Sequence, residues 1–184
     1  MAPRLDPKRC LWRPVWSRDD AYFHHSLVPD EAGGIWTWEA HGSAAAQNQR
    51  LIRFDEETGE TLKALDLLED IILGNDQGRL RFVLPESFRF KENTGEGPDD
   101  IFHPNELEPL PVDMPSAFPG FETRDLLISL PNSNMLAVIG REDNSIKWAA
   151  CGPWWRQHDP YFQPDGTITV FSNFRNASGQ RCFD

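Results

Sequence analysis

The sequence predicts an all-β fold, and three observations support this. The chain of 184 residues contains seven Trp and twelve Phe, and large flat side chains suit the pleated surface of a sheet. Fifteen Pro and thirteen Gly indicate many turns between short elements. Short apolar or alternating runs recur between these turns. At this length we expect one domain with its own hydrophobic core.

The first predicted strands lie between residues 33 and 65. Residues 33–39 alternate apolar and polar side chains after a Gly-Gly turn, which is typical of a strand. Residues 50–54 and 61–65 flank a glycine-bearing turn and predict a hairpin. The small and polar stretch 41–49 predicts a loop, and His41 within it a surface position. Apolar residues at helical spacing over 67–73, just before Gly74, predict one short helix.

The second half of the chain repeats the hairpin. Residues 135–139 and 145–149 flank the turn 140–144, and residues 125–130 predict a further strand. The stretch 104–119 is too rich in proline for a regular helix. Residues 75–99 interrupt the pattern with acidic residues, Gly and Pro, and we interpret them as an insert over the rim of the sheets.

A unit of strand, loop, histidine and strand is written three times, with a histidine at the same place in each copy. Radial repetition of four-stranded antiparallel sheets is a β-propeller. The alternative is a β-sandwich with coincidentally similar hairpins. The three copies centre on His158, His103 and the pair His24-His25, and the first and last continue into the turns Pro29-Asp30 with Gly33-Gly34, and Pro164-Asp165-Gly166.

The count of strands predicts an incomplete propeller over residues 1–184. We interpret residues 8–13 as the last strand of one blade and residues 167–173 as the second strand of another. About two full blades lie between them. Closed propellers need roughly four to eight blades. We therefore expect a truncation, a partial gene model, or partner chains, including further copies of this chain, that complete the ring.

Composition excludes some classes of function. The net charge of −11, without a cluster of Lys or Arg, argues against nucleic acid as a partner. Cys10, Cys151 and Cys182 show no zinc-binding spacing, and we expect Cys10 and Cys151 to be buried in neighbouring strands rather than joined by a disulfide. The sequence as written shows no signal peptide and no apolar run of membrane-spanning length.

The histidines are the candidate catalytic residues. Because the first strands of successive propeller blades line a central channel, His25, His103 and His158 are expected to converge there. Histidine transfers protons near neutral pH and acts as a nucleophile. Arg156 could bind an anionic group, and Asp159 and Asn105 could orient the imidazoles of His158 and His103. The alternative is that each histidine is a turn residue bonded to backbone.

Two further interpretations concern these residues. A metal site is set aside, and stacking of a ligand on tryptophan stays open. Three histidines around an axis could ligate zinc or copper. However, the sequence has no His-x-His or His-x-x-x-His pair, and adjacent His24 and His25 would point to opposite faces of a strand, so we predict no metal. Trp154 and Trp155 could stack a flat ligand or pack under a neighbouring blade.

The sequence resembles arylsulfotransferase-like proteins. The similarity covers most of residues 10–173, and it is carried by His24-His25 with Pro29-Asp30, by residues 100–110 and 125–130, and by residues 152–160 with the turn Pro164-Asp165-Gly166. The resemblance implies a six-bladed propeller that moves a sulfuryl group from a phenolic sulfate ester to another phenol. It also implies a transiently sulfated histidine and no cofactor. Members of this family are often exported or attached to membranes.

Carried over by motif, the resemblance makes His158 the nucleophile. His103 and His25, or His24 in its place, become the acid, base or anion-binding partners. The family's anion-clamping arginine usually follows the strand at 128–130, where this chain has Pro131, and Arg156 is the candidate to replace it. The first hypothesis is thus a sulfuryl transferase. The others are a non-catalytic binding or interaction module that has lost the arginine, and a propeller hydrolase or lyase using the same histidines.

Overall fold

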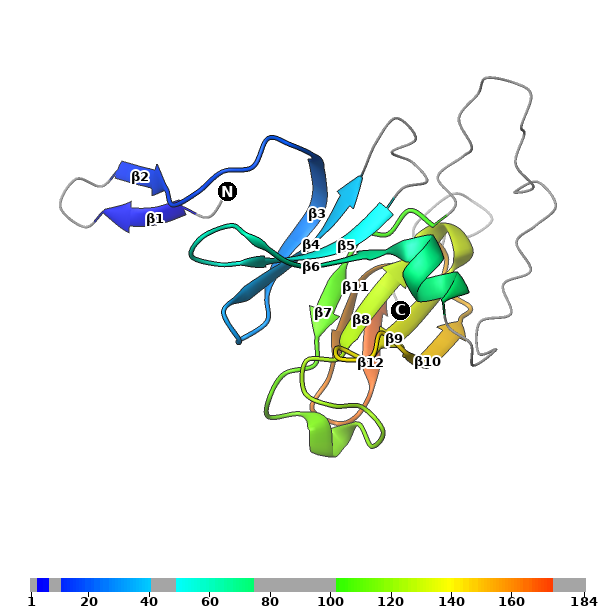
Figure 1. Cartoon of the computed structure of the whole chain (residues 1–184). Coiled ribbons are helices and arrows are strands. Elements are labelled where there is room, and N and C mark those ends of the chain that lie inside the picture. Colours follow the sequence, from blue (N-terminus) through cyan, green and yellow to red (C-terminus); the bar gives the residue numbers. More distant parts are fainter. Residues whose placement is uncertain (1–2, 7–10, 41–48, 75–101, 174–184) are drawn as a thin grey trace, which may run out of the picture.

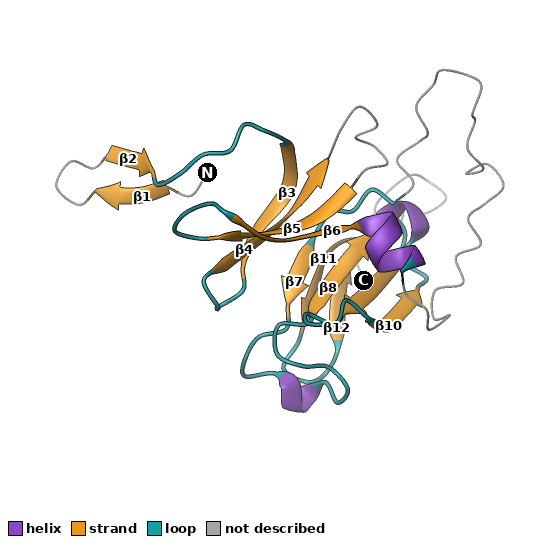
Figure 2. Ribbon diagram, viewed as in Figure 1, coloured by secondary structure: helices purple, strands orange, loops and turns teal. Residues whose placement is uncertain are grey.

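The structure is a computed structural model, and it describes residues 3–6, 11–40, 49–74 and 102–173 (Figure 1). Strands dominate the described chain (Figure 2). The insert predicted at 75–99, His41, Cys10 and Cys182 lie outside the described residues, as does the loop predicted at 41–49 except for Gln49, which begins a strand. No helix in the described ranges has the length and apolarity needed to cross a membrane.

Two four-stranded antiparallel sheets form the centre of the molecule, and in each of them every strand pairs with the next strand of the chain. The all-β prediction is confirmed, as are the strands predicted at 33–39 and 125–130 and the hairpins at 50–65 and 135–149. The first sheet consists of β3 (Tyr22–Pro29), β4 (Gly34–Ala40), β5 (Gln49–Asp55) and β6 (Thr61–Asp66), and the second of β7 (Leu107–Pro109), β8 (Leu126–Leu130), β9 (Met135–Ile139) and β10 (Ile146–Cys151).

Two antiparallel strand pairs lie at the ends of the described chain. β11 (His158–Phe162) pairs with β12 (Ile168–Phe171), which confirms the strand predicted from residue 167 onward. β1 (Pro3–Asp6) pairs with β2 (Leu11–Pro14). Figure 1 shows this first hairpin as an arm that stands away from the sheets, whereas β11 and β12 lie against the second sheet.

The predicted short helix is present at Leu67–Leu73, as a single π-helical segment. The carboxylate of Asp66 caps its start by accepting hydrogen bonds from the backbone N–H groups of Leu68 and Glu69. The helix ends at Gly74, as the sequence predicted. Two single 3-10 turns, at Pro115–Ala117 and Pro131–Ser133, complete the helical structure of the described residues.

The second sheet is buried on both faces, because side chains alternate along its strands. Leu126 and Ile128 of β8 enter a core shared with the first sheet, where Trp36 and Trp38 also lie. Leu127, between them in sequence, enters the other core with residues of β11 and β12, including Phe162. The layers therefore run in the order first sheet, second sheet, β11–β12, with a separate apolar core at each boundary.

A buried aspartate before the second strand anchors each complete sheet. Asp30, whose side chain is fully buried, pairs with Arg53 of β5 at 2.6 Å and accepts a hydrogen bond from the indole N–H of Trp36 at 3.3 Å. Asp125 pairs with Lys147 of β10 at 2.8 Å. A buried carboxylate needs such partners because desolvation disfavours its charge.

One expectation about cysteine is wrong. Cys151 is a free thiol and is exposed, whereas the sequence suggested that it would be buried. The reason is its position at the end of β10, an edge strand whose side chains become more exposed from Ile146 onward.

Candidate active site

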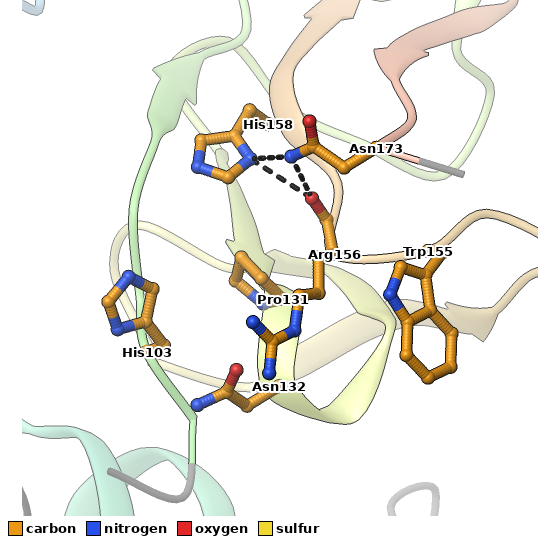
Figure 3. Close-up of a pocket in the computed structure, with 7 residues that line it drawn as sticks. All are labelled: His103, Pro131, Asn132, Trp155, Arg156, His158 and Asn173. Carbon is orange, nitrogen blue, oxygen red and sulfur yellow. Dashed lines mark hydrogen bonds between the residues drawn. The ribbon is translucent and has the colours of Figure 1, made fainter. Parts of the chain in front are cut away.

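A cavity of about 760 Å³ opens where the second sheet meets the β11–β12 hairpin (Figure 3). Its residues come from the segment before β7, the turn after β8, the segment before β11 with the first residue of that strand, and the residues that follow β12. They are His103, Pro131, Asn132, Trp155, Arg156, His158 and Asn173. Two of the three predicted catalytic histidines, His103 and His158, therefore face one cavity.

His158 is held by two groups that both reach its Nδ1 atom. The backbone carbonyl of Arg156 lies 3.0 Å from Nδ1, and the side-chain amide nitrogen of Asn173 lies 3.1 Å from it (Figure 3). The same amide donates to the Arg156 carbonyl at 2.7 Å. That bond decides the orientation of the amide, because a flipped Asn173 would place its oxygen against the carbonyl oxygen.

This arrangement differs from the prediction that Asp159 orients His158. Asp159 is exposed, and the imidazole forms its hydrogen bonds with Arg156 and Asn173 instead. When Nδ1 carries the proton, it donates to the Arg156 carbonyl and leaves Nε2 with a free lone pair. When Nδ1 is unprotonated, it accepts from Asn173. Both neutral tautomers of His158 thus have a partner.

The other histidines form a row that leads from the cavity to the first sheet. The ring centroid of His103 lies 5.6 Å from that of His25, and that of His25 lies 4.8 Å from that of His24, both edge to face. At the far end, Nε2 of His24 lies 2.7 Å from the side-chain oxygen of Gln49 in β5. Of the three histidines predicted to converge, His103 and His158 line one cavity, and His25 is connected to it through its ring contact with His103.

The expectation that His24 and His25 point to opposite faces is wrong. A regular strand would separate them, but the pairing of β3 with β4 shifts register between His24 and Val28. His25 also has a φ of 62°, in the left-handed region. This bulge turns the His25 side chain toward that of His24.

Left-handed backbone recurs at the predicted site residues. His103, Arg156 and Asp159 have φ values of 48°, 44° and 47°. Such conformations are uncommon for residues other than glycine and cost on the order of 1 kcal/mol each, so they persist where the surrounding structure holds them. Two of these residues, His103 and Arg156, line the cavity, which supports it as the candidate active site.

Asn105 has a different position from the one predicted. It is completely buried, its side-chain nitrogen donates to the carbonyl of Gln157 at 2.9 Å, and its oxygen accepts from the backbone N–H of Glu106. Gln157 is also completely buried and donates to the carbonyl of Met135 at 2.7 Å. These buried amides attach the segment before His158 to the second sheet. Asn105 therefore holds that segment in place and does not orient the His103 ring.

The model of the family described as arylsulfotransferase (ASST) matches residues 14–182. The chain belongs to the arylsulfotransferase family. This confirms the resemblance seen in the sequence. Comparison with curated proteins and with solved structures gave no match.

Pro131 of this ASST family member stands where the resemblance leads one to expect the family's arginine. Pro131 is buried and lines the cavity directly after β8. Arg156 lines the same cavity, and Figure 3 shows its guanidinium directed toward Asn132. Trp155 forms a further wall and is 52% exposed. The cavity thus offers one guanidinium and one accessible aromatic face.

The side chains described at the ASST site do not form a set of metal ligands. Within the described ranges, no three His, Cys, Asp or Glu side chains gather closely enough to hold a metal ion. The rings of His25 and His103 meet edge to face, whereas metal ligands direct their nitrogens at one point.

Sequence reasoning missed Asn173, Asn132 and Gln157 as site residues. Gln157 precedes His158 directly, and a buried amide there was not suggested by any pattern. Asn173 follows the strand that pairs with β11, where His158 lies opposite Phe171. The predicted hairpin could have pointed to Asn173, because residues just past a paired strand lie beside the start of its partner.

Proposed function

We propose that this ASST family member transfers a sulfuryl group from a phenolic sulfate ester to a phenol through a sulfated His158. The observation that carries the proposal is the opening of His158, His103 and Arg156 into one cavity of about 760 Å³. A nucleophile, a proton carrier and a cation are the three functions that this transfer needs. The sulfate ester is itself the donor, so the reaction uses no cofactor.

In the first half-reaction, the Nε2 lone pair of His158 attacks sulfur and the bond between sulfur and the aryl oxygen breaks. The departing aryl oxygen takes a proton from protonated His103, and a phenol leaves. In the sulfated histidine the imidazole ring is positively charged, next to the negative sulfuryl group, and keeps its proton on Nδ1. The carbonyl of Arg156, 3.0 Å from Nδ1, stabilises that charge by accepting a hydrogen bond.

In the second half-reaction, His103 is the base. It takes the proton of the acceptor phenol as the phenolic oxygen attacks sulfur, and the bond between sulfur and Nε2 breaks. His158 returns to its neutral form with its proton on Nδ1, and His103 is protonated again. His25 and His24, in ring contact with His103 and with each other, extend the route by which this proton reaches the first sheet.

Arg156 and Trp155 supply binding for the two parts of an aryl sulfate. The guanidinium attracts the sulfate oxygens and the charge that develops on them. The accessible indole face of Trp155 stacks the aryl ring. Asn132, beside Pro131, adds an amide donor at the place where the family's arginine usually lies.

We further propose that the sheets are blades of a propeller. Three sheets stacked through two separate cores, with strands in chain order, support this arrangement. The histidines also support it, because each lies in or just before the first strand of its sheet. Completion of the ring by further blades would enclose the cavity from the open side.

The competing function is a non-catalytic binding module. Pro131 favours it, because a buried proline in the cavity wall provides no charge for the sulfate. Such a module would bind an aryl sulfate through Arg156 and Trp155 without cleaving it.

One experiment separates the two. The protein is incubated with an aryl sulfate, and intact mass is followed together with phenol release. Transfer predicts a gain of about 80 Da, one sulfuryl group, as for any covalent intermediate. Replacement His158→Ala removes the adduct, whereas Tyr161→Phe on the exposed side of the same strand keeps it. Binding of the ester with neither adduct nor phenol release refutes transfer and supports the module.

A further inference from the structure

We infer that a second cavity, between the β3–β4 turn and the end of β7, binds a small zwitterion of the α-amino acid class. The Arg124 guanidinium takes the carboxylate of this ligand, and the Glu108 carboxylate takes its ammonium group. The cavity measures about 200 Å³ and shares no lining residue with the one that holds His103 and His158. The inference therefore goes beyond the proposed sulfuryl transfer and does not depend on it.

The second cavity lies at the far end of the first strands of the two sheets. β3 carries the histidine pair near its start, and its end and the following turn line the cavity with residues 28–31. β7 begins after His103, and its end lines the cavity with residues 108–111. Arg124, shortly before β8, completes the wall. A ligand here is held between two sheets, at the opposite end of their first strands from the histidines.

Arg124 presents a guanidinium whose hydrogen-bonding capacity is largely unused. Its Nε is buried and has no hydrogen-bond partner among the described residues. Its Nη2 reaches the carbonyl of Glu31 at 3.5 Å, the outer limit of a hydrogen bond. Within the described chain, no carboxylate forms an ion pair with it. Buried donors are almost always bonded to protein, water or a ligand, and a carboxylate matches the fork of a guanidinium.

The backbone around Arg124 fixes this wall of the cavity. The N–H of Arg124 donates to the carbonyl of Leu110 at 2.8 Å, and the N–H of Leu110 donates to the carbonyl of Asp125 at 2.8 Å. Leu110 also lines the cavity and is completely buried. The guanidinium is thus attached to a segment that is already ordered, which reduces the cost of ordering on binding.

Glu108 supplies the opposite charge. Its Oε2 accepts a hydrogen bond from the backbone N–H of Phe162 at 3.0 Å. In the part of the chain that the structure describes, no Lys or Arg forms an ion pair with it. Burial raises the pKa of Glu108 to about 7, as expected for a partly desolvated carboxylate without a cation beside it. An ammonium group in the cavity supplies that cation.

The other charges at the cavity do not replace these two. Asp30 is fully buried and already paired with Arg53 at 2.6 Å, and Glu31 is exposed to solvent. Glu108 and Arg124 line the same cavity, yet no ion pair joins them. Two opposite charges held apart in one cavity match a ligand that carries both. Glu108 disfavours a simple anion, and Arg124 disfavours a simple cation.

The volume and the apolar wall of the cavity set the size of the ligand. A volume of 200 Å³ is the share of roughly seven water molecules in the liquid. Val28 and Leu110 form the apolar part of the wall together with Pro29, Pro109 and Pro111. A small aliphatic amino acid fits this combination, because its two charged groups meet Glu108 and Arg124 while its side chain contacts the apolar wall.

The test is isothermal titration calorimetry of the full chain with L-valine and with two analogues that each lack one charge. Isobutylamine lacks the carboxylate of valine, and isovalerate lacks its ammonium group. L-valine should bind, and each analogue should bind about tenfold more weakly or worse, because each loses a charge-assisted hydrogen bond. The analogues require no substitution in the protein, so the inference stays testable if a variant fails to fold.

Two variants assign the ends of the ligand. Glu108→Gln and Arg124→Gln should each weaken the binding of L-valine about tenfold, again through loss of a charge-assisted bond. The matched control Arg141→Gln removes an arginine that does not line the cavity and should leave the affinity unchanged. Absence of L-valine binding, or an analogue that binds as tightly as L-valine, overturns the inference. Since the readout is binding of an amino acid rather than sulfation, failure here is distinguishable from failure of the proposed transfer.

Discussion

The two hairpins that carry histidines, β3–β4 and β11–β12, have the same plan and different surroundings. Each has a histidine on its first strand and an aspartate in the turn that follows. Asp30 is buried and bound by Arg53, whereas Asp165 is exposed and, among the described residues, accepts hydrogen bonds from the backbone N–H and hydroxyl of Thr167 in its own turn. Arg53 comes from β5, the third strand of the first sheet. The third strand of the first sheet thus supplies the ion-pair partner with which the aspartate of this turn is buried.

The histidines of these hairpins show the same difference. His24 contacts the side-chain amide of Gln49, which again comes from β5. His158 contacts the side-chain amide of Asn173, which follows the second strand of its own hairpin. In the first hairpin the orienting group comes from a neighbouring strand, and in the last it comes from within the hairpin.

The largest effect should follow removal of the buried anchor. Asp30→Ala leaves the Arg53 guanidinium without its partner in a largely buried position. Breaking a buried ion pair in this way costs about 3–5 kcal/mol of the free energy of unfolding. Urea denaturation of the variant and the wild type measures this loss.

Acid should weaken the same anchor. Burial alone raises the pKa of Asp30, but the Arg53 guanidinium and the backbone N–H groups of Ala32 and Gly34 outweigh it, so the net pKa lies below its ordinary value. The stabilisation is therefore present above the ordinary pKa of an aspartate and is lost as pH falls through the lowered value. An Asp30→Ala variant with wild-type stability at neutral pH would contradict the role of the third strand.

The second effect concerns orientation of His158. Asn173→Ala removes the amide that bonds both the Arg156 carbonyl and Nδ1. We expect sulfuryl uptake by His158 to slow about tenfold, equivalent to about 1.4 kcal/mol, because the Arg156 carbonyl and the imidazole ring lose a group that holds them in position. The measurement is the time course of the mass adduct, with nitrogen NMR of the imidazole to report which nitrogen carries the proton.

Gln49→Ala is the matched control for Asn173→Ala. It removes an amide partner from His24, which lies in the other hairpin and outside the cavity of His158. Uptake at His158 should change little in this variant. Equal slowing in both variants would show that the amides act on the fold in general rather than on their own histidines.

The sequence predicted the strands of this fold well, because alternation and turn residues are local signals. Residues 33–39 and 125–130 form strands as predicted, and the repeated histidine unit predicted that His103 and His158 would lie together. The bulge at His25 was not predictable, because it depends on a register shift against β4. Spacing along one strand contains no information about that shift.

The supporting residues of the site were predicted less well for a related reason. Asp159 and Asn105 follow their histidines in sequence, and proximity suggested that they orient them. In the structure Asn105 is buried against Gln157, and the partner of His158 is Asn173, reached through strand pairing. Proximity in sequence suggests neighbouring residues as the partners of a histidine, whereas antiparallel pairing brings residues from the far end of a hairpin next to it.

A smaller effect should come from Glu108, which ties the β11–β12 hairpin to the second sheet. Its carboxylate accepts a hydrogen bond from the backbone N–H of Phe162 at 3.0 Å. Burial raises the pKa of Glu108 to about 7, although the Phe162 N–H acts in the opposite direction. The carboxyl therefore binds a proton in the folded state at pH values where the unfolded chain has lost it, so stability should fall as pH rises from about 4.5 to about 7.

Glu108→Gln keeps an acceptor for the Phe162 N–H and removes the titration. Above pH 7 the variant should be more stable than the wild type by about 1 kcal/mol, since the side chain is only partly buried and solvent screens part of the effect. Thermal unfolding at pH 5 and pH 8 measures the difference. A wild type that is more stable at pH 8 than the variant would contradict a raised pKa for the partly buried Glu108.

The smallest effect should follow Asp165→Ala, the counterpart of Asp30→Ala. The turn keeps its backbone bonds, from Gln163 N–H to the Thr167 carbonyl at 2.9 Å and from Gly166 N–H to the Gln163 carbonyl at 3.0 Å. Gly166, with a φ of 83°, supplies the left-handed position that this turn requires. An exposed turn substitution of this kind should lower Tm by about 1–2 °C. A loss as large as that of Asp30→Ala would mean that Asp165 meets a partner outside its own turn.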